Sequence, residues 1–151
     1  MVESVLYAYM EEQLKRTPVS FRRYLYDGIP WENQMTGIVG ARGVGKSTML
    51  KQYILSRKDR QQMLYVSADH TYFTDHSLTA LADEFVKDGG TYLFIDEVHK
   101  YRNWSRELKQ IYDIHPGLHV VFTGSSIMDI EKGEADLTRR ALMYKLEGLS
   151  F

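Results

Sequence analysis

Three glycines, one lysine and two hydroxyl residues lie close together in this sequence with the spacing of a phosphate-binding loop. The segment fits the pattern G-x-x-x-x-G-K-[ST] and consists of Gly40, Ala41, Arg42, Gly43, Val44, Gly45, Lys46, Ser47 and Thr48. Glycines let backbone N–H groups approach a phosphate without hindrance from side chains. We therefore predict that all these residues bind nucleotide phosphates. Lys46 would also act in catalysis by neutralising the β- and γ-phosphates, and Ser47 would ligate Mg²⁺.

Two adjacent carboxylates follow an apolar run about fifty residues further along the chain. The run Tyr92–Ile95 is followed by Asp96 and Glu97, which is typical of a buried strand that delivers an acid to a metal site. We predict that Asp96 holds Mg²⁺ through a water molecule. Glu97 is the predicted base that orients the attacking water or accepts its proton. The alternative is that both acids simply begin a solvated loop.

A third polar segment follows another apolar run. Residues 123–126 read Thr-Gly-Ser-Ser, directly after Val-Val-Phe. We predict that Ser125 contacts the γ-phosphate or the attacking water, with Thr123 or Ser126 as alternatives. An ordinary turn at the end of a strand would explain the same residues.

Two adjacent arginines, Arg139 and Arg140, precede the last apolar segment. One of them could act as a catalytic residue on the nucleotide of a neighbouring subunit, where such arginines raise the rate by ~10³–10⁵. A solvated basic pair is the alternative. His99 has no second histidine at ligand spacing, which favours a structural role over metal binding. Trp31 could contact a nucleobase, although core packing is the simpler interpretation.

Strand-like and helix-like segments alternate along the chain. The predicted strands are 35–39, 63–67, 92–95, 119–122 and 141–146, and the predicted helices are 2–14, 47–56, 75–87 and 104–114. Such alternation predicts an α/β fold with a parallel sheet and helices on both faces. Ligands bind at the carboxyl ends of the strands in such sheets, which is where the loop and the acids fall.

Composition restricts the classes of protein further. The chain has 151 residues, 44% of them apolar and 26% charged, with a net charge of −1, as expected for one ordinary globular domain. The absence of cysteine excludes disulfides, thiolate catalysis and cysteine-ligated zinc. No stretch approaches the ~18 apolar residues of a membrane span. We expect a cytoplasmic protein with no membrane contact.

Taken together, these segments resemble the ATPase core of a prokaryotic group of predicted AAA+ ATPases. The resemblance spans roughly residues 30–151 and rests on 40–48, 92–98 with 103–105, 123–126, and 137–140 with 149–151. It implies a three-layer P-loop NTPase core of about five strands, in which an extra strand separates the loop strand from the acidic strand. It also implies hydrolysis of ATP with Mg²⁺, with Glu97 as the base.

The resemblance further implies how the chain is divided. Residues 1–30 would be a helical and aromatic lead-in segment, and residues 31–151 the ATP-binding core. Members of the group commonly continue after the segment that matches 149–151 with a helical lid and a C-terminal domain. We therefore expect this chain to be a fragment. Homo-oligomers through Arg139 and Arg140, an unknown protein partner, and nucleic acid through the C-terminal part are the expected partners besides ATP.

Three functions compete at this point. The first is an ATPase whose turnover drives a conformational change in an attached domain or partner. The second is a nucleotide-gated signalling switch with little turnover, against which Glu97 argues because a pure binder needs no base. The third is a nucleic-acid helicase, suggested by the sequence Asp-Glu-Val-His at 96–99, although the chain has no basic strip interleaved with aromatics.

Overall fold

Five parallel strands form the centre of the protein in the order β2-β3-β4-β1-β5. The computed structural model describes residues 1–18, 28–40, 45–125, 137 and 140–146. The strands are β1 (Met35–Gly40), β2 (Met63–Ser67), β3 (Tyr92–Asp96), β4 (His119–Ser125) and β5 (Leu142–Leu146). Strand β4 lies between the loop strand β1 and the acidic strand β3. The predicted α/β class and the predicted extra strand between these two are therefore confirmed.

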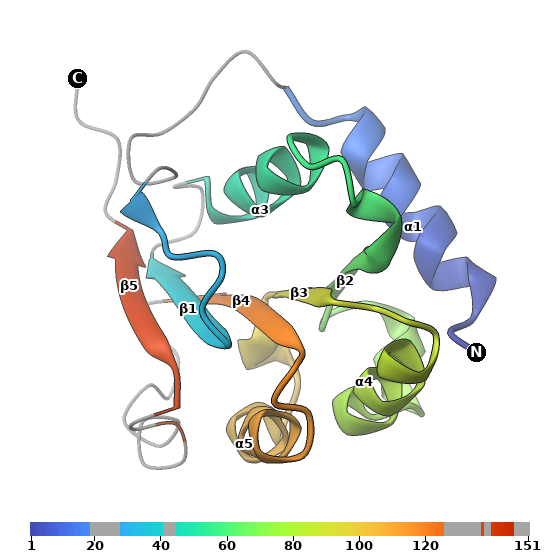
Figure 1. Ribbon diagram of the computed structural model, residues 1–151, viewed down its shortest axis with the longest axis vertical. Coiled ribbons are helices and arrows are strands. Elements are labelled where there is room, and N and C mark those ends of the chain that lie inside the picture. Colours follow the sequence, from blue (N-terminus) through green and yellow to red (C-terminus); the bar gives the residue numbers. More distant parts are fainter. Residues whose placement is uncertain (19–27, 41–44, 126–136, 138–139, 147–151) are drawn as a thin grey trace.

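Helices cover both faces of the sheet. They are α1 (Ser4–Lys15), α3 (Lys46–Leu55), α4 (Leu78–Lys87) and α5 (Trp104–Ile114), with short 3-10 turns at Arg60–Gln62, Thr71–Thr74 and Val98–Lys100. Figure 1 shows α1 and α3 on one face of the sheet and α4 and α5 on the other. This arrangement confirms the predicted three layers. Within the described ranges, no helix has both the length and the apolar character needed to cross a membrane.

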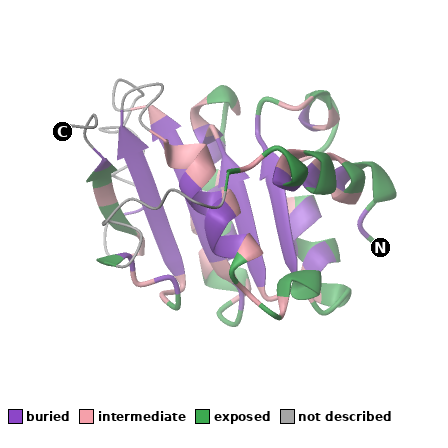
Figure 2. Cartoon of the chain, turned by 90° about the horizontal axis from the view of Figure 1, so that it is seen from above, coloured by how far each residue is buried: buried purple, intermediate pink, exposed green. Residues whose placement is uncertain are grey.

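Burial explains why the strands are continuous apolar runs rather than alternating ones. Every residue of β1, β2 and β3 is buried, as expected for strands with helices on both sides. Strand β5 lies at the edge of the sheet, and its Leu142 and Met143 remain exposed (Figure 2). The buried strands therefore form a rigid base for whatever lies at their ends.

Two predicted boundaries differ from the structure by three residues, and the other differences are of one or two residues. The helix predicted from residue 75 begins at Leu78, because the side chain of Ser77 accepts a hydrogen bond from the N–H of Ala80 and caps it. The strand predicted to end at residue 122 continues to Ser125, because Thr123–Ser125 pair with Ile38–Gly40 of β1. Residues expected in a loop thus belong to the sheet, which fixes their positions.

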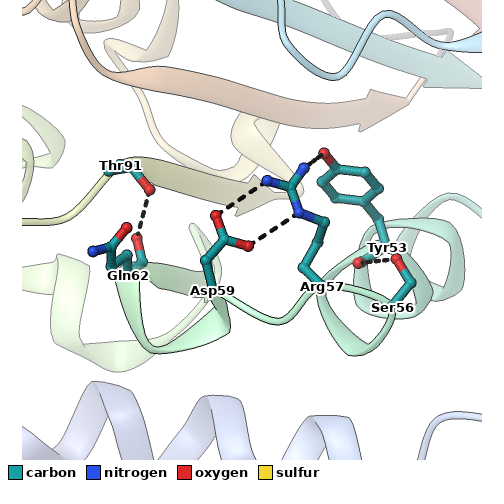
Figure 3. Close-up of polar contacts among 6 residues, drawn as sticks. All are labelled: Tyr53, Ser56, Arg57, Asp59, Gln62 and Thr91. Carbon is teal, nitrogen blue, oxygen red and sulfur yellow. Dashed lines mark hydrogen bonds and ion pairs between the residues drawn. The ribbon is translucent and has the colours of Figure 1, made fainter.

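A cluster around Arg57 holds the far end of α3. The guanidinium donates to both carboxylate oxygens of Asp59, at 3.0 and 3.1 Å, and to the hydroxyl of Tyr53 (Figure 3). It also lies 5.4 Å from the ring centroids of Tyr53 and Tyr92. Trp31 stacks on Tyr53 at 4.1 Å and is buried, so it packs in the core. The cluster fixes the C-terminal end of α3 against the sheet, and the phosphate loop is at the other end of this helix.

Gly37 lets β1 pack closely against its neighbours. A Cβ at this position would lie 2.5 Å from Cζ of Phe122 and 2.6 Å from Sδ of Met143. The ring of Phe122 is fully buried, and protein interiors are close-packed. The strand that leads into the phosphate loop therefore requires glycine at this point.

We expect Gly37→Ala to lower the free energy of unfolding by about 1–3 kcal/mol, because the added methyl overpacks the core. Urea denaturation measures the difference. Gly117→Ala is the matched control, since nothing lies within 4 Å of a Cβ at that position, and its effect should stay within about 0.5 kcal/mol. Equal losses in the two variants would contradict the packing argument.

Candidate functional site

The ends of three strands and the start of α3 meet at the carboxyl edge of the sheet. Strand β1 ends at Gly40, β3 at Asp96 and β4 at Ser125, and α3 begins at Lys46. Gly40 is the register partner of Ser125 across the β1–β4 ladder. The structure therefore brings the ends of the predicted phosphate loop together with the predicted acids and the predicted γ-phosphate contact.

The start of α3 has the geometry of an anion site. Gly45 precedes the helix with φ 93°, a left-handed conformation that favours glycine. The first N–H groups of a helix have no partner within it, and the helix dipole places partial positive charge there. Lys46 and Ser47 occupy this first turn. Loop, helix and cation together suit a phosphate group.

Lys46 extends back toward the end of β1. Its Nζ donates a hydrogen bond of 2.7 Å to the carbonyl oxygen of Gly40. Burial lowers the pKa of Lys46, and the charges of Asp96 and Glu97 act in the opposite direction. The ammonium group thus contacts the end of β1 and is close enough to both acids for their charges to act on it.

Asp96 is buried and its carboxylate accepts hydrogen bonds from hydroxyl groups of three different elements. Its side chain is 4% exposed. Ser47 of α3 and Tyr65 of β2 donate to Oδ2, and Thr123 of β4 donates to Oδ1. A buried carboxylate is costly unless such bonds compensate its lost hydration. The three donors fix both oxygens of Asp96 in one orientation.

Glu97 has an unusual backbone conformation at the end of β3. Its φ of 53° and ψ of 48° place it in the left-handed region, and it is the one non-glycine residue with positive φ among those described. Such a conformation costs of order 1–3 kcal/mol and persists where surrounding contacts enforce it. Here the N–H of Glu97 donates to Oγ1 of Thr123 at 2.9 Å. One threonine therefore contacts the carboxylate of Asp96 and the backbone of Glu97.

The available ligands fit a magnesium ion that is bound together with a nucleotide. In the part of the chain that the structure describes, no group of three or more His, Asp or Glu side chains could hold a metal by itself. Mg²⁺ usually keeps several waters and is held by one or two protein groups plus substrate phosphates. The hydroxyl of Ser47 and the carboxylate of Asp96 are oxygen donors in direct contact. They suit that mode of binding.

The segment after Glu97 is tied to the tip of β4. The N–H of Ser125 donates to Nδ1 of His99 at 3.3 Å, and burial lowers the pKa of His99, which favours the neutral ring that can accept this bond. His99 thus has a contact within the fold, as expected for a structural role. Ser126 and residues 41–44 of the predicted site lie outside the described residues.

Arg140 lies away from the other predicted site residues. Its guanidinium pairs with the carboxylate of Asp113 on α5, at 3.0 and 3.3 Å, and this hydrogen bonding lowers the pKa of Asp113. Asp113 precedes β4 and Arg140 precedes β5. The pair therefore lies near the amino ends of the strands, whereas Asp96 lies at a carboxyl end. Arg139 is outside the described residues. An action of either arginine on a neighbouring subunit stays a prediction.

Sequence analysis did not identify two residues that lie near Asp96. Tyr65 donates to its carboxylate, and Lys51 of α3 is half-buried with a pKa that burial lowers and Asp96 raises. Tyr65 is 31 positions before Asp96 in the chain. Its proximity follows from the pairing of β2 with β3, which no local pattern in the sequence specifies. Lys51 could have been noticed as a lysine one helical turn after Ser47.

Comparisons with known proteins indicate the family and the fold of this chain. A family model described as an AAA domain matches residues 32–151. No curated protein matches the sequence. The structure of AMPPCP-bound DnaA from Aquifex aeolicus is similar to this one, with a TM-score of 0.53 and 17% sequence identity. The similarity covers 97% of this chain and 48% of the DnaA chain, so this chain spans about half the length of that structure.

Removal of the Thr123 hydroxyl tests whether this residue holds the two acids. We expect Thr123→Val to lower the free energy of unfolding by about 2–3 kcal/mol, because a hydrogen bond to a buried carboxylate is lost. Chemical denaturation gives the value.

The matched control is Thr36→Val on the adjacent strand. Thr36 is also fully buried, but its hydroxyl has no hydrogen-bond partner among the described residues. The same substitution there should be neutral within about 0.5 kcal/mol or slightly stabilising. A loss at Thr36 as large as that at Thr123 would show that the acids do not depend on the hydroxyl.

Proposed function

Because the chain belongs to the AAA domain family, we propose that it binds ATP with Mg²⁺ and hydrolyses it. The observation that carries the proposal is the arrangement of Asp96 and Glu97, which are held by one threonine beside the start of α3. Lys46 and Ser47 lie in the first turn of that helix. Adenine as the base is supported by the similar DnaA structure, which contains AMPPCP, an analogue of ATP.

The residues divide the chemistry among them. The loop that ends at Gly45, together with Lys46, would hold the β- and γ-phosphates, and Ser47 and Asp96 would hold the magnesium ion. Mg²⁺ supplies neutralisation of the phosphate charge. Glu97 would orient a water molecule and accept its proton as the water oxygen bonds to the γ-phosphorus and the bond to the ADP oxygen breaks. Ser125 is the proposed contact to the γ-phosphate.

Turnover would move the elements that meet at the site. The end of β4 contacts the segment after β3 through Thr123 and Ser125. Loss of the γ-phosphate would therefore change the position of that strand end and of α3. We propose that this movement acts on an attached domain or a protein partner. Residues 31–151 would be the ATP-binding core of a cytoplasmic protein, and Arg139 or Arg140 would act between copies of it.

Lys46→Ala tests the phosphate loop. We expect it to weaken binding of a fluorescent ATP analogue by roughly a hundredfold, because it removes a charge that contacts the phosphates. Fluorescence titration measures the affinity. Lys58→Ala, which removes the same charge from an exposed position after α3, serves as the control and should bind normally. An unchanged affinity in Lys46→Ala would exclude the loop as the phosphate site.

Glu97→Gln tests the base. We expect the variant to bind ATP normally and to hydrolyse it about 10²–10⁴ times more slowly, because the amide cannot accept the proton. Phosphate release, measured across a range of protein concentrations, gives the rate. Glu11→Gln on the exposed side of α1 is the control. Turnover in Glu97→Gln equal to the unmodified chain would exclude this role, and binding without turnover in the unmodified chain would favour a switch.

A further inference from the structure

The phenol of Tyr65 contacts the predicted metal carboxylate from strand β2. Its hydroxyl donates to the same oxygen of Asp96 that accepts from Ser47. The side chain is 1% exposed. A phenol has an ordinary pKa of about 10 and is protonated at neutral pH, so the hydroxyl acts as the donor. Nothing in the chemistry of the phosphate loop requires this bond.

Helix α1 holds Tyr65 in place. The ring of Tyr9 is nearly parallel to that of Tyr65, with centroids 6.2 Å apart and planes 9° apart. Sδ of Met10 accepts a hydrogen bond from the backbone N–H of Tyr65 at 3.3 Å. The position of Tyr65, and with it the direction of its hydroxyl, therefore depends on contacts from α1.

Lys51 joins α1, α3 and Tyr65. Its Nζ lies 5.4 Å from the centre of the Tyr65 ring and donates to the side-chain oxygen of Gln13 at 3.1 Å. Figure 1 shows α1 and α3 on the same face of the sheet. The helix that begins at the phosphate loop is thus linked to α1 through the same aromatic ring that contacts Asp96.

Helix α1 is firmly docked although it lies outside residues 32–151, the range matched by the AAA domain model. Leu6, Met10 and Leu14 are buried against the core. Just before the helix, the N–H of Val2 donates at 2.8 Å to the carboxylate of Asp88, the residue that follows α4. Helix α1 is therefore packed into the fold and can support a residue of the site.

We propose that Tyr65 is a positioning residue for Asp96 and that α1, by holding Tyr65, is a functional part of the metal site. The inference rests on the proposed function. Residues that orient a metal ligand typically change metal affinity by about 10–100-fold when they are lost. Here the phenol restrains the carboxylate, so its removal should affect the magnesium-dependent part of nucleotide binding and leave the metal-independent part unchanged.

The test is a titration of the chain with a fluorescent ATP analogue, first in EDTA and then at increasing Mg²⁺. In Tyr65→Phe we expect unchanged affinity in EDTA and about a tenfold increase in the Mg²⁺ concentration needed for half of the affinity gain. Tyr9→Leu should shift the Mg²⁺ requirement in the same direction by a smaller factor. This second variant keeps the test open if Tyr65→Phe does not fold, which circular dichroism will show.

Tyr53→Phe is the matched control. It also removes a tyrosine hydroxyl bond, in this case to Arg57 at the other end of α3, and should leave the Mg²⁺ requirement unchanged. If the Mg²⁺ requirement of Tyr65→Phe is unchanged or lowered, the inference is overturned while the proposed function stands. An equal shift of the Mg²⁺ requirement in Tyr53→Phe has the same meaning. Absence of nucleotide binding by the unmodified chain overturns both.

Discussion

The structure depends on the burial of one carboxylate. Asp96 is at the end of a central strand and is almost inaccessible to water. An ionised carboxylate in such a place is tolerated only when hydrogen bonds replace its hydration. The required donors come from Ser47, Tyr65 and Thr123, which belong to α3, β2 and β4. The chain must therefore bring three separate elements to one point before this charge can be buried.

The strand order makes that convergence possible. Because β3 lies between β2 and β4, side chains from both neighbours reach Asp96 without crossing the sheet. Because β4 also neighbours β1, its end lies beside the end of the loop strand, where Gly40 is opposite Ser125. A direct β1–β3 pairing would place the loop nearer the acids but leave no strand to carry Thr123 between them.

Local patterns in the sequence predicted much of this arrangement. The glycine loop, the acid pair and the buried strands have short-range signatures in residue type and spacing, and the strand and helix positions follow from them. The extra strand between the loop strand and the acidic strand came from the resemblance to a family, because pairing between distant strands has no local signature. The donor role of Tyr65 and the pairing of Arg140 with Asp113 were missed for that reason.

The left-handed backbone of Glu97 was missed for a different reason. Contacts between distant segments of the folded chain impose it, and no local pattern in the sequence predicts it. Its N–H is fixed by the same hydroxyl that donates to Asp96, so the strain at Glu97 and the burial of Asp96 are stabilised together by Thr123. Folding thus fixes the carboxylate of Asp96 and the backbone of Glu97 before any ligand binds. A hydroxyl that donates its proton to a carboxylate still has lone pairs for a metal ion, so Ser47 can bind magnesium without releasing Asp96. Under the proposed function, such a site would need little rearrangement on binding nucleotide and metal, which is the condition under which fixed polar groups are most effective in catalysis.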